Sequence, residues 1–108
     1  MRNLNLAGLE PAGEKHVEIW LIDNGYTNII KETVQPDEVI IKATGTLENI
    51  IIRVKTFLHP HNPFKLSEYD VDRLTRKAIN IKHVPYAAYV VLDDKYDLAG
   101  EIIWERLS

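Results

Sequence analysis

The spacing of apolar residues changes along this chain, and each change predicts a different element of secondary structure. From Gly13 onward, apolar residues recur at intervals of three and four with acidic residues between them, which predicts an amphipathic helix over residues 12–24. Gly25 follows this helix and is able to adopt the left-handed conformation that ends many helices. Residues 1–10 carry only a weak pattern, and we expect them to form a short or frayed segment.

Shorter apolar runs bounded by turn residues predict five strands. Their expected ranges are residues 26–32, 38–44, 49–57, 86–93 and 102–104. A turn at residues 35–37 separates the first two strands, and Gly45 begins the hairpin connection between the second and the third. The run YAAYVVLD is almost continuously apolar, which is typical of a strand that is buried on both faces.

A second amphipathic helix is predicted between the third and fourth strands. Ser67 is a favourable N-cap residue, with Asp70 at the third helical position, and apolar residues at helical spacing continue to about residue 80. Residues 59–63 contain two prolines three positions apart, which excludes regular structure there. The resulting order, α-β-β-β-α-β-β, predicts an α/β or α+β sandwich in which helices cover a central sheet.

Length and composition narrow the class of protein. A chain of 108 residues is expected to form one domain, residues 1–108, and 45 % apolar residues are enough for a core. The absence of cysteine excludes disulfides and thiolate–zinc sites. The N-terminal residues lack the apolar run of a signal peptide, and no segment reaches the ~20 apolar residues of a membrane span. We therefore expect a cytoplasmic protein without membrane contact.

The segment ENIIIRVKTF places two cations on a strand that otherwise avoids charge. Arg53 and Lys55 are two residues apart, so they are expected to point to the same face of the strand. Together they form a small cationic spot with two alternative roles. It holds a phosphate group, or it pairs with carboxylates such as Glu14, Glu18 or Glu38 on a half-exposed strand face.

Four segments of the chain occur in the order and spacing of a known group of proteins. They are AGEKHVEIWLIDNGY, IIKATGTLENIIIRVKT, FKLSEYDVDRLTRKA and AAYVVLD. In the first segment, Glu14 precedes Gly25-Tyr26 by about three helical turns. In the second, Ala43 precedes a strand that ends in Val-Lys-Thr. These features resemble the PD-(D/E)xK nuclease superfamily, and in particular archaeal Holliday-junction resolvases and the small bacterial endonuclease-like proteins related to them.

The resemblance implies both a fold and a chemistry. The fold is the restriction-endonuclease-like three-layer sandwich, an α/β architecture with a mixed central sheet. The reaction is hydrolysis of a phosphodiester bond, in which Asp and Glu carboxylates hold one or two Mg²⁺ ions and a Lys positions the attacking water. When the family's strand motif is aligned on Ala43, its metal-binding Asp corresponds to Ile40 and its metal-binding Glu corresponds to Arg53. Lys55 and Glu14 are the catalytic residues that the chain retains.

These replacements reverse the charge of the implied metal site. Mg²⁺ requires oxygen ligands, and Ile40 supplies none, whereas Arg53 carries a permanent positive charge. At about 4 Å and an effective dielectric of ~20, each unit of opposing charge costs about 4 kcal/mol. We therefore expect a nuclease-fold protein that has lost hydrolysis, holds no metal and acts by binding nucleic acid or a protein partner.

Two alternatives stay open. An active Mg²⁺-dependent endonuclease needs relocated carboxylates, for which Glu14 and Glu38 are the candidates. A structural or accessory subunit without a nucleic-acid role agrees with the net charge of −3, which argues against a basic nucleic-acid coat protein. The resemblance implies a homo-oligomer in every case, with DNA as the expected nucleic acid.

The candidate binding surface extends beyond the two cations of the third strand. It comprises Arg53, Lys55, Lys42, Lys65, Arg73 and Arg76. The members on the second helix share one side of that helix. A phosphate-binding surface and an ordinary solvated helix face are therefore the two alternatives for them.

Overall fold

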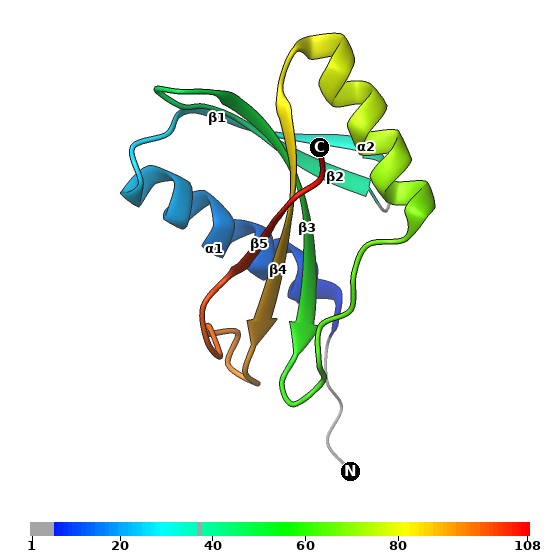
Figure 1. Cartoon of the computed structure of the whole chain (residues 1–108). Helices are drawn as coiled ribbons and strands as arrows, with labels where there is room; N and C mark the ends of the chain where they lie inside the picture. The colour runs from blue at the N-terminus through cyan, green and yellow to red at the C-terminus, as the bar shows by residue number, and fades with distance from the viewer. Residues whose placement is uncertain (1–5, 37) are drawn as a thin grey trace.

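The computed structural model describes residues 6–36 and 38–108. Predictions that concern residues 1–5 and Asp37 therefore lie outside the described residues. Along the chain the elements are a short 3₁₀ turn, η1 (Leu6–Gly8), and then α1 (Leu9–Asp23), β1 (Thr27–Gln35), β2 (Glu38–Thr44), β3 (Asn49–Leu58), α2 (Glu68–Ile81), β4 (Val84–Leu92) and β5 (Ile103–Arg106), as Figure 1 shows. The predicted order of helices and strands is confirmed.

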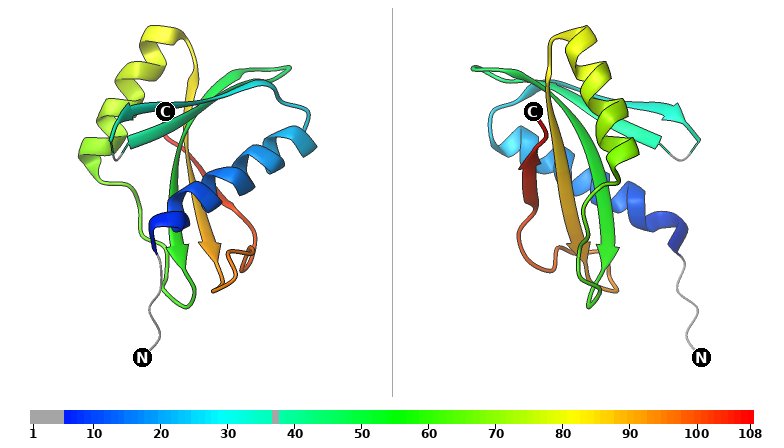
Figure 2. Two further views of the ribbon diagram at one scale, coloured as in Figure 1. Left: turned by 180° about the vertical axis from the view of Figure 1, so that it is seen from behind. Right: turned by 45° about the vertical axis from the view of Figure 1, so that its right-hand side comes forward.

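The five strands form one mixed sheet between two helices. They lie side by side in the order β1-β2-β3-β4-β5. β3 and β4 are parallel, and the other neighbours are antiparallel. α1 packs on one face, chiefly against β3, and α2 covers the opposite face (Figure 1 and Figure 2). The predicted three-layer α/β sandwich with a mixed sheet is confirmed.

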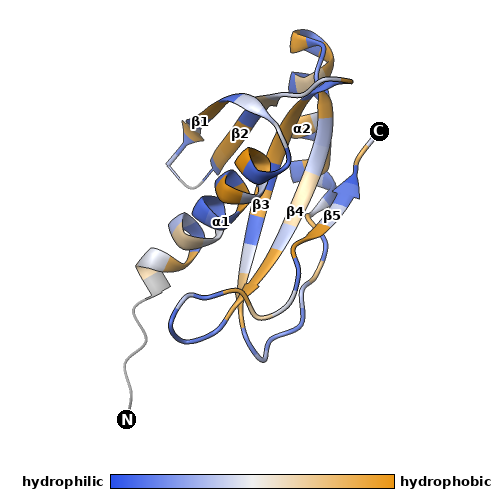
Figure 3. Cartoon of the chain, turned by 90° about the vertical axis from the view of Figure 1, so that its left-hand side faces the viewer, coloured by the Kyte–Doolittle hydropathy of each residue, from blue (hydrophilic) through white to orange (hydrophobic). Residues whose placement is uncertain are grey.

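Alternating side chains of the central strands fill two hydrophobic layers. Beneath α1, Leu21 belongs to a buried cluster with Ile41 and Ile52. Beneath α2, Leu74 belongs to a second cluster with Ile40. Figure 3 looks onto the α1 side of the sheet, where the helix crosses the strands with hydrophobic and hydrophilic residues alternating around it. Neighbouring residues of β2 therefore serve different layers.

The helix boundaries differ in part from the prediction. α1 begins at Leu9, three residues before the predicted start. Pro11 is tolerated because it lies in the first helical turn, where a backbone N–H has no helical partner. The predicted cap of α2 is confirmed, since the Ser67 Oγ accepts a hydrogen bond of 3.1 Å from the Asp70 N–H. Within the described residues, no helix is long and apolar enough to cross a membrane.

Most strand ends also differ from the prediction. β1 extends to Gln35 rather than residue 32, β3 ends at Leu58 rather than 57, β4 covers Val84–Leu92 rather than 86–93, and β5 covers Ile103–Arg106 rather than 102–104. Pairing across the sheet accounts for such shifts. For example, the Pro85 carbonyl accepts a hydrogen bond of 2.9 Å from the Leu107 N–H, just beyond β5. The sequence of one strand does not specify these partners.

Gly13 allows α1 to approach β3 closely. A Cβ atom at this position would lie 1.9 Å from the Oγ1 and 2.8 Å from the Cγ2 of Thr56, which is buried on β3. Gly13 itself is buried in the middle of the helix–sheet contact. The helix therefore needs glycine here for space, although glycine lowers intrinsic helix stability.

We expect Gly13→Ala to destabilise the protein by about 1–3 kcal/mol, because the added methyl group overpacks the contact with Thr56. In an uncrowded helix interior the same change stabilises by about 1 kcal/mol, so the sign of the effect tests the packing. Chemical denaturation measures the free energy of unfolding. Lys15→Ala, at an exposed position of the same helix, is the control and should have a small effect. Adding Thr56→Ala to Gly13→Ala should restore part of the loss, and a Gly13→Ala variant as stable as the wild type contradicts the prediction.

Candidate functional site

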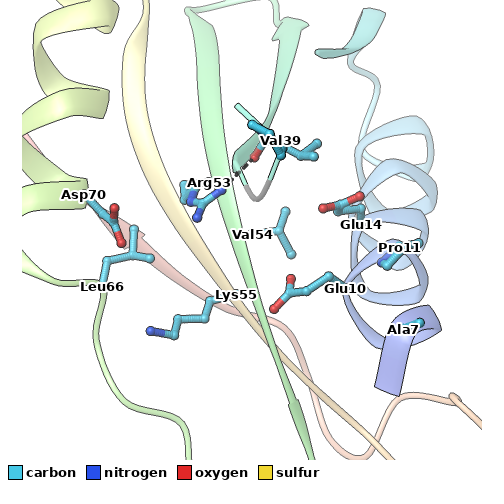
Figure 4. Close-up of a pocket in the computed structure, with 11 residues that line it drawn as sticks. Ala7, Glu10, Pro11, Glu14, Val39, Arg53, Val54, Lys55, Leu66 and Asp70 are labelled. Carbon is cyan, nitrogen blue, oxygen red and sulfur yellow. Dashed lines mark hydrogen bonds between the residues drawn. The ribbon is translucent and has the colours of Figure 1, made fainter. Parts of the chain in front are cut away.

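A cavity lies where the pairing of β2 with β3 ends. The two strands pair from Thr44–Asn49 as far as Ile40–Arg53, and β3 then continues to Leu58 while the N-terminal half of α1 lies beside it. The cavity has a volume of about 400 Å³. Its polar lining comes from three elements (Figure 4): Glu10 and Glu14 from α1, Arg53 and Lys55 from β3, and Asp70 from α2. Two cations and three carboxylates therefore share one cavity.

Arg53 and Lys55 enter the cavity from the same strand. The Arg53 Nη1 donates a hydrogen bond of 3.4 Å to the Val39 carbonyl of β2. The Lys55 Nζ lies 4.0 Å from the centroid of the Phe64 ring, at cation–π distance. Among the described residues, neither side chain forms an ion pair with a carboxylate. Both charges are therefore available to a bound anion.

The carboxylates of α1 have other partners. Glu14 is buried, and its Oε1 lies 3.3 Å from the Lys31 Nζ of β1. Glu10 lies one helical turn earlier, and its Oε1 accepts a hydrogen bond of 3.2 Å from the Thr56 N–H. Although Glu10 as a whole is exposed, partial burial of its carboxyl group raises its pKa, and this effect outweighs the lowering by the Thr56 hydrogen bonds. The nearby Glu14 charge adds to the increase, and Arg53 opposes it.

The other predicted binding residues do not line this cavity. Each forms an ion pair elsewhere: Lys42 with Glu32 at 2.9 Å, Lys65 with Glu105 at 2.9 Å, Arg73 with Glu38 at 3.2 Å and Arg76 with Asp72 at 3.0 Å. The structure therefore brings together only two members of the predicted surface, Arg53 and Lys55. Long-range pairing of this kind is not visible in a sequence pattern.

Ile40 and Arg53 are cross-strand partners. Ile40 is 1 % exposed and packs in the cluster beneath α2 instead of lining the cavity. The two residues are therefore backbone neighbours across the β2–β3 pair. Their side chains differ in use, since one fills the core and the other reaches the cavity.

The side chains of the cavity do not fit a divalent ion. Glu38, one of the two candidate ligands, pairs with Arg73 and does not line the cavity, whereas Glu14 does. In the described ranges, no three His, Cys, Asp or Glu side chains come together in a way that could hold a metal ion. Arg53 adds a fixed positive charge to the same space. Glu14 and Glu38 therefore do not line the same cavity, and their roles as metal ligands stay a prediction.

Two side chains of this region have roles that the sequence pattern did not indicate. Glu10 lies four positions before Glu14, on the same helix face, so the position of Glu14 was the signal that could have indicated it. Phe64 follows Pro63 in a loop predicted only to be irregular. No periodicity identifies a loop residue whose ring packs on Lys55.

Comparison with known proteins supports the fold. No protein-family model and no curated protein sequence matches the chain. The chain is similar to a solved structure of Hjc, a Holliday junction resolvase from the archaeal hyperthermophile Archaeoglobus fulgidus, with a TM-score of 0.65 and 15 % identity. The alignment covers 91 % of this chain and 72 % of that chain. The expected restriction-endonuclease-like fold is confirmed, while a homo-oligomer and a protein partner remain predictions.

We expect Glu10→Gln to stabilise the protein more at neutral than at acidic pH. The raised pKa of Glu10 means that the folded state binds this proton more tightly than the unfolded state. Stability contributed by the protonated form is therefore present below the ordinary pKa and is lost as the pH rises through the raised pKa. Glutamine keeps an oxygen acceptor for Thr56 and cannot ionise. The difference in melting temperature, variant minus wild type, should be larger at about pH 7 than at about pH 4, and a difference that is constant or falls with pH contradicts this.

Proposed function

We propose that this protein binds nucleic acid through phosphate contacts made by Arg53 and Lys55, and that it does not hydrolyse the phosphodiester backbone. The observation that supports this most is the placement of these two cations in one cavity without an ion-pair partner among the described residues. A similar fold serves a Holliday junction resolvase. That likeness supports nucleic acid as the class of ligand.

The two cations offer complementary contacts to a phosphate. The Arg53 guanidinium is planar and can form paired hydrogen bonds with two phosphate oxygens, whereas the Lys55 ammonium acts as a point charge. Because both extend from one strand, their spacing is set by the rigid sheet rather than by a flexible loop. The site therefore requires little rearrangement to receive an anion.

The carboxylates in the cavity limit the strength of this binding. Glu10, Glu14 and Asp70 line the same space, and their charges oppose a phosphate. Lys31 offsets the charge of Glu14. We therefore expect modest affinity with a shallow dependence on salt, since that dependence grows with the number of phosphate contacts and only two cations make them here.

The absence of hydrolysis follows from the side chains at the expected ligand positions. Ile40 provides no oxygen and lies in the core, and Arg53 repels a divalent ion from the cavity. Of the three carboxylates in the cavity, Glu10 accepts a hydrogen bond from the Thr56 N–H, Glu14 pairs with Lys31, and Asp70 lines the cavity from α2. The cavity thus favours an anion over a cation at the strand side.

We expect Arg53→Gln and Lys55→Gln each to weaken nucleic-acid binding and to reduce the dependence of the logarithm of affinity on the logarithm of salt concentration by about 1, as loss of one phosphate contact does. Fluorescence anisotropy with labelled DNA over a salt series measures both quantities. Lys95→Gln, in the turn after β4 and outside the cavity lining, is the matched control. Unchanged binding by the double variant contradicts the proposed site, and no binding of any nucleic acid by the wild type favours the structural-subunit alternative.

We expect no cleavage of supercoiled, branched or single-stranded DNA by the wild-type protein with Mg²⁺ or Mn²⁺. Gel electrophoresis after prolonged incubation measures this. Cleavage that disappears in both Lys55→Ala and Glu14→Gln contradicts the loss of hydrolysis and supports the alternative of relocated carboxylates. Cleavage that persists in both variants points to a contaminating nuclease.

A further inference from the structure

We propose that the nucleic acid is bound through unpaired nucleotides, with one base stacked on Phe64 beside the phosphate site. This inference rests on the proposed function and adds the class of substrate, single-stranded or locally unpaired nucleic acid. It is carried by the position and exposure of Phe64, the way its loop is held, and the apolar recess next to it.

Phe64 is a large aromatic side chain that the fold leaves in solvent. Its exposed fraction is 63 %, whereas Phe57, which contacts it edge to face at 5.0 Å between ring centroids, is 7 % exposed. The buried ring therefore supports the exposed one. The Lys55 Nζ lies 4.0 Å from the Phe64 centroid, so a phosphate held by Lys55 lies within the reach of a single nucleotide whose base contacts Phe64.

The loop that carries Phe64 is held by contacts with two neighbouring strands, β4 and β5. The Leu66 N–H donates to the Tyr89 hydroxyl at 3.1 Å, and that hydroxyl donates to the Glu105 Oε1 at 2.8 Å. The Lys65 Nζ lies 2.9 Å from the other oxygen of the same carboxylate. Lys65 and Leu66 directly follow Phe64, so β4 and β5 fix the segment that presents the ring. A preorganised side chain loses little conformational entropy on binding.

A second cavity adjoins the exposed ring. Its volume is about 470 Å³, and Phe64, Phe57 and Leu9 supply apolar walls, with His61 and Asn62 at polar positions. A planar base fits such a recess because its face contacts apolar atoms while its edge meets hydrogen-bonding groups. The recess and the cationic cavity both border the β3 segment from Lys55 to Phe57. Base and phosphate binding are therefore placed side by side.

Stacking on a protein ring requires a base that is not already stacked and paired in a duplex. A duplex would bring phosphates to Arg53 and Lys55 but would keep its base faces hidden. The combination of a cationic pair with an exposed aromatic ring is the arrangement by which single strands are held without sequence preference. The pairing of these features on one face thus favours an unpaired strand over a duplex.

The test compares three labelled 12-nucleotide probes by fluorescence anisotropy at one salt concentration: oligothymidylate, the same backbone with abasic sites throughout, and the oligothymidylate annealed to oligoadenylate. The wild type should bind oligothymidylate more tightly than the other two probes.

Phe64→Leu keeps an apolar side chain and removes the aromatic face, and it should weaken oligothymidylate binding by about tenfold. Tyr69→Leu, which removes another exposed aromatic side chain (67 % exposed) outside both cavities, is the matched control.

The outcomes separate this inference from the proposed function. Equal binding of oligothymidylate and the duplex by the wild type, or equal oligothymidylate binding by Phe64→Leu and the wild type, overturns the stacking site. The phosphate site still stands in that case if Arg53→Gln and Lys55→Gln weaken binding of all three probes. Selective loss of oligothymidylate binding in Phe64→Leu, with duplex and abasic binding unchanged, supports the inference. Failure of every probe to bind overturns both.

Discussion

The close contact of α1 with β3 at Gly13 and Thr56 is the constraint on which the candidate site depends. The position that a Cβ of residue 13 would occupy lies only 1.9 Å from the Thr56 Oγ1, so the helix lies against the strand with no side chain between them. Glu10 and Glu14 stand on either side of Gly13 along the helix, and both reach the cavity. The N–H group of the same Thr56 holds the Glu10 carboxylate. The packing of α1 against β3 thus also determines where its two acidic side chains lie.

The distribution of charge, more than its total, determines which cations can contact an anion. The chain carries a net charge of −3, yet ion pairs at its surface occupy the cations of α2 and β2. The exposed pair of Arg76 and Asp72 contributes about 0–1 kcal/mol, so its effect on stability is small. The ion pairs of α2 and β2 have a larger effect on the electrostatic field of the protein, because they neutralise cations away from the cavity. Arg53 and Lys55 have no ion-pair partner among the described residues. Both side chains are half-buried, where solvent screens their charges less.

Ile40 and Arg53, which are partners across two strands, contribute to different parts of the structure. Ile40 joins the cluster beneath α2 with Ile51 and Leu74, and burial of such a side chain stabilises by about 1.5–3 kcal/mol. An acidic side chain at this depth requires a partner to compensate the loss of water. The fold neighbour Hjc is similar at a TM-score of 0.65 although only 15 % of residues are identical, so the shared architecture requires few identical residues. Arg53 instead places a positive charge in the cavity.

The sequence by itself determined the order of the elements, the sandwich of helices and sheet, the cap at Ser67 and the common face of Arg53 and Lys55. These features depend on local periodicity and on the alternation of side chains along a strand, and both can be recognised from residues close together in the sequence. Only the tertiary structure decided which carboxylate pairs with which cation, that Glu10 shares the cavity, and that Phe64 lies over Lys55. Those contacts join residues far apart in the sequence, for example 46 positions for Glu10 and Thr56, and their geometry arises only when helix, strand and loop pack together.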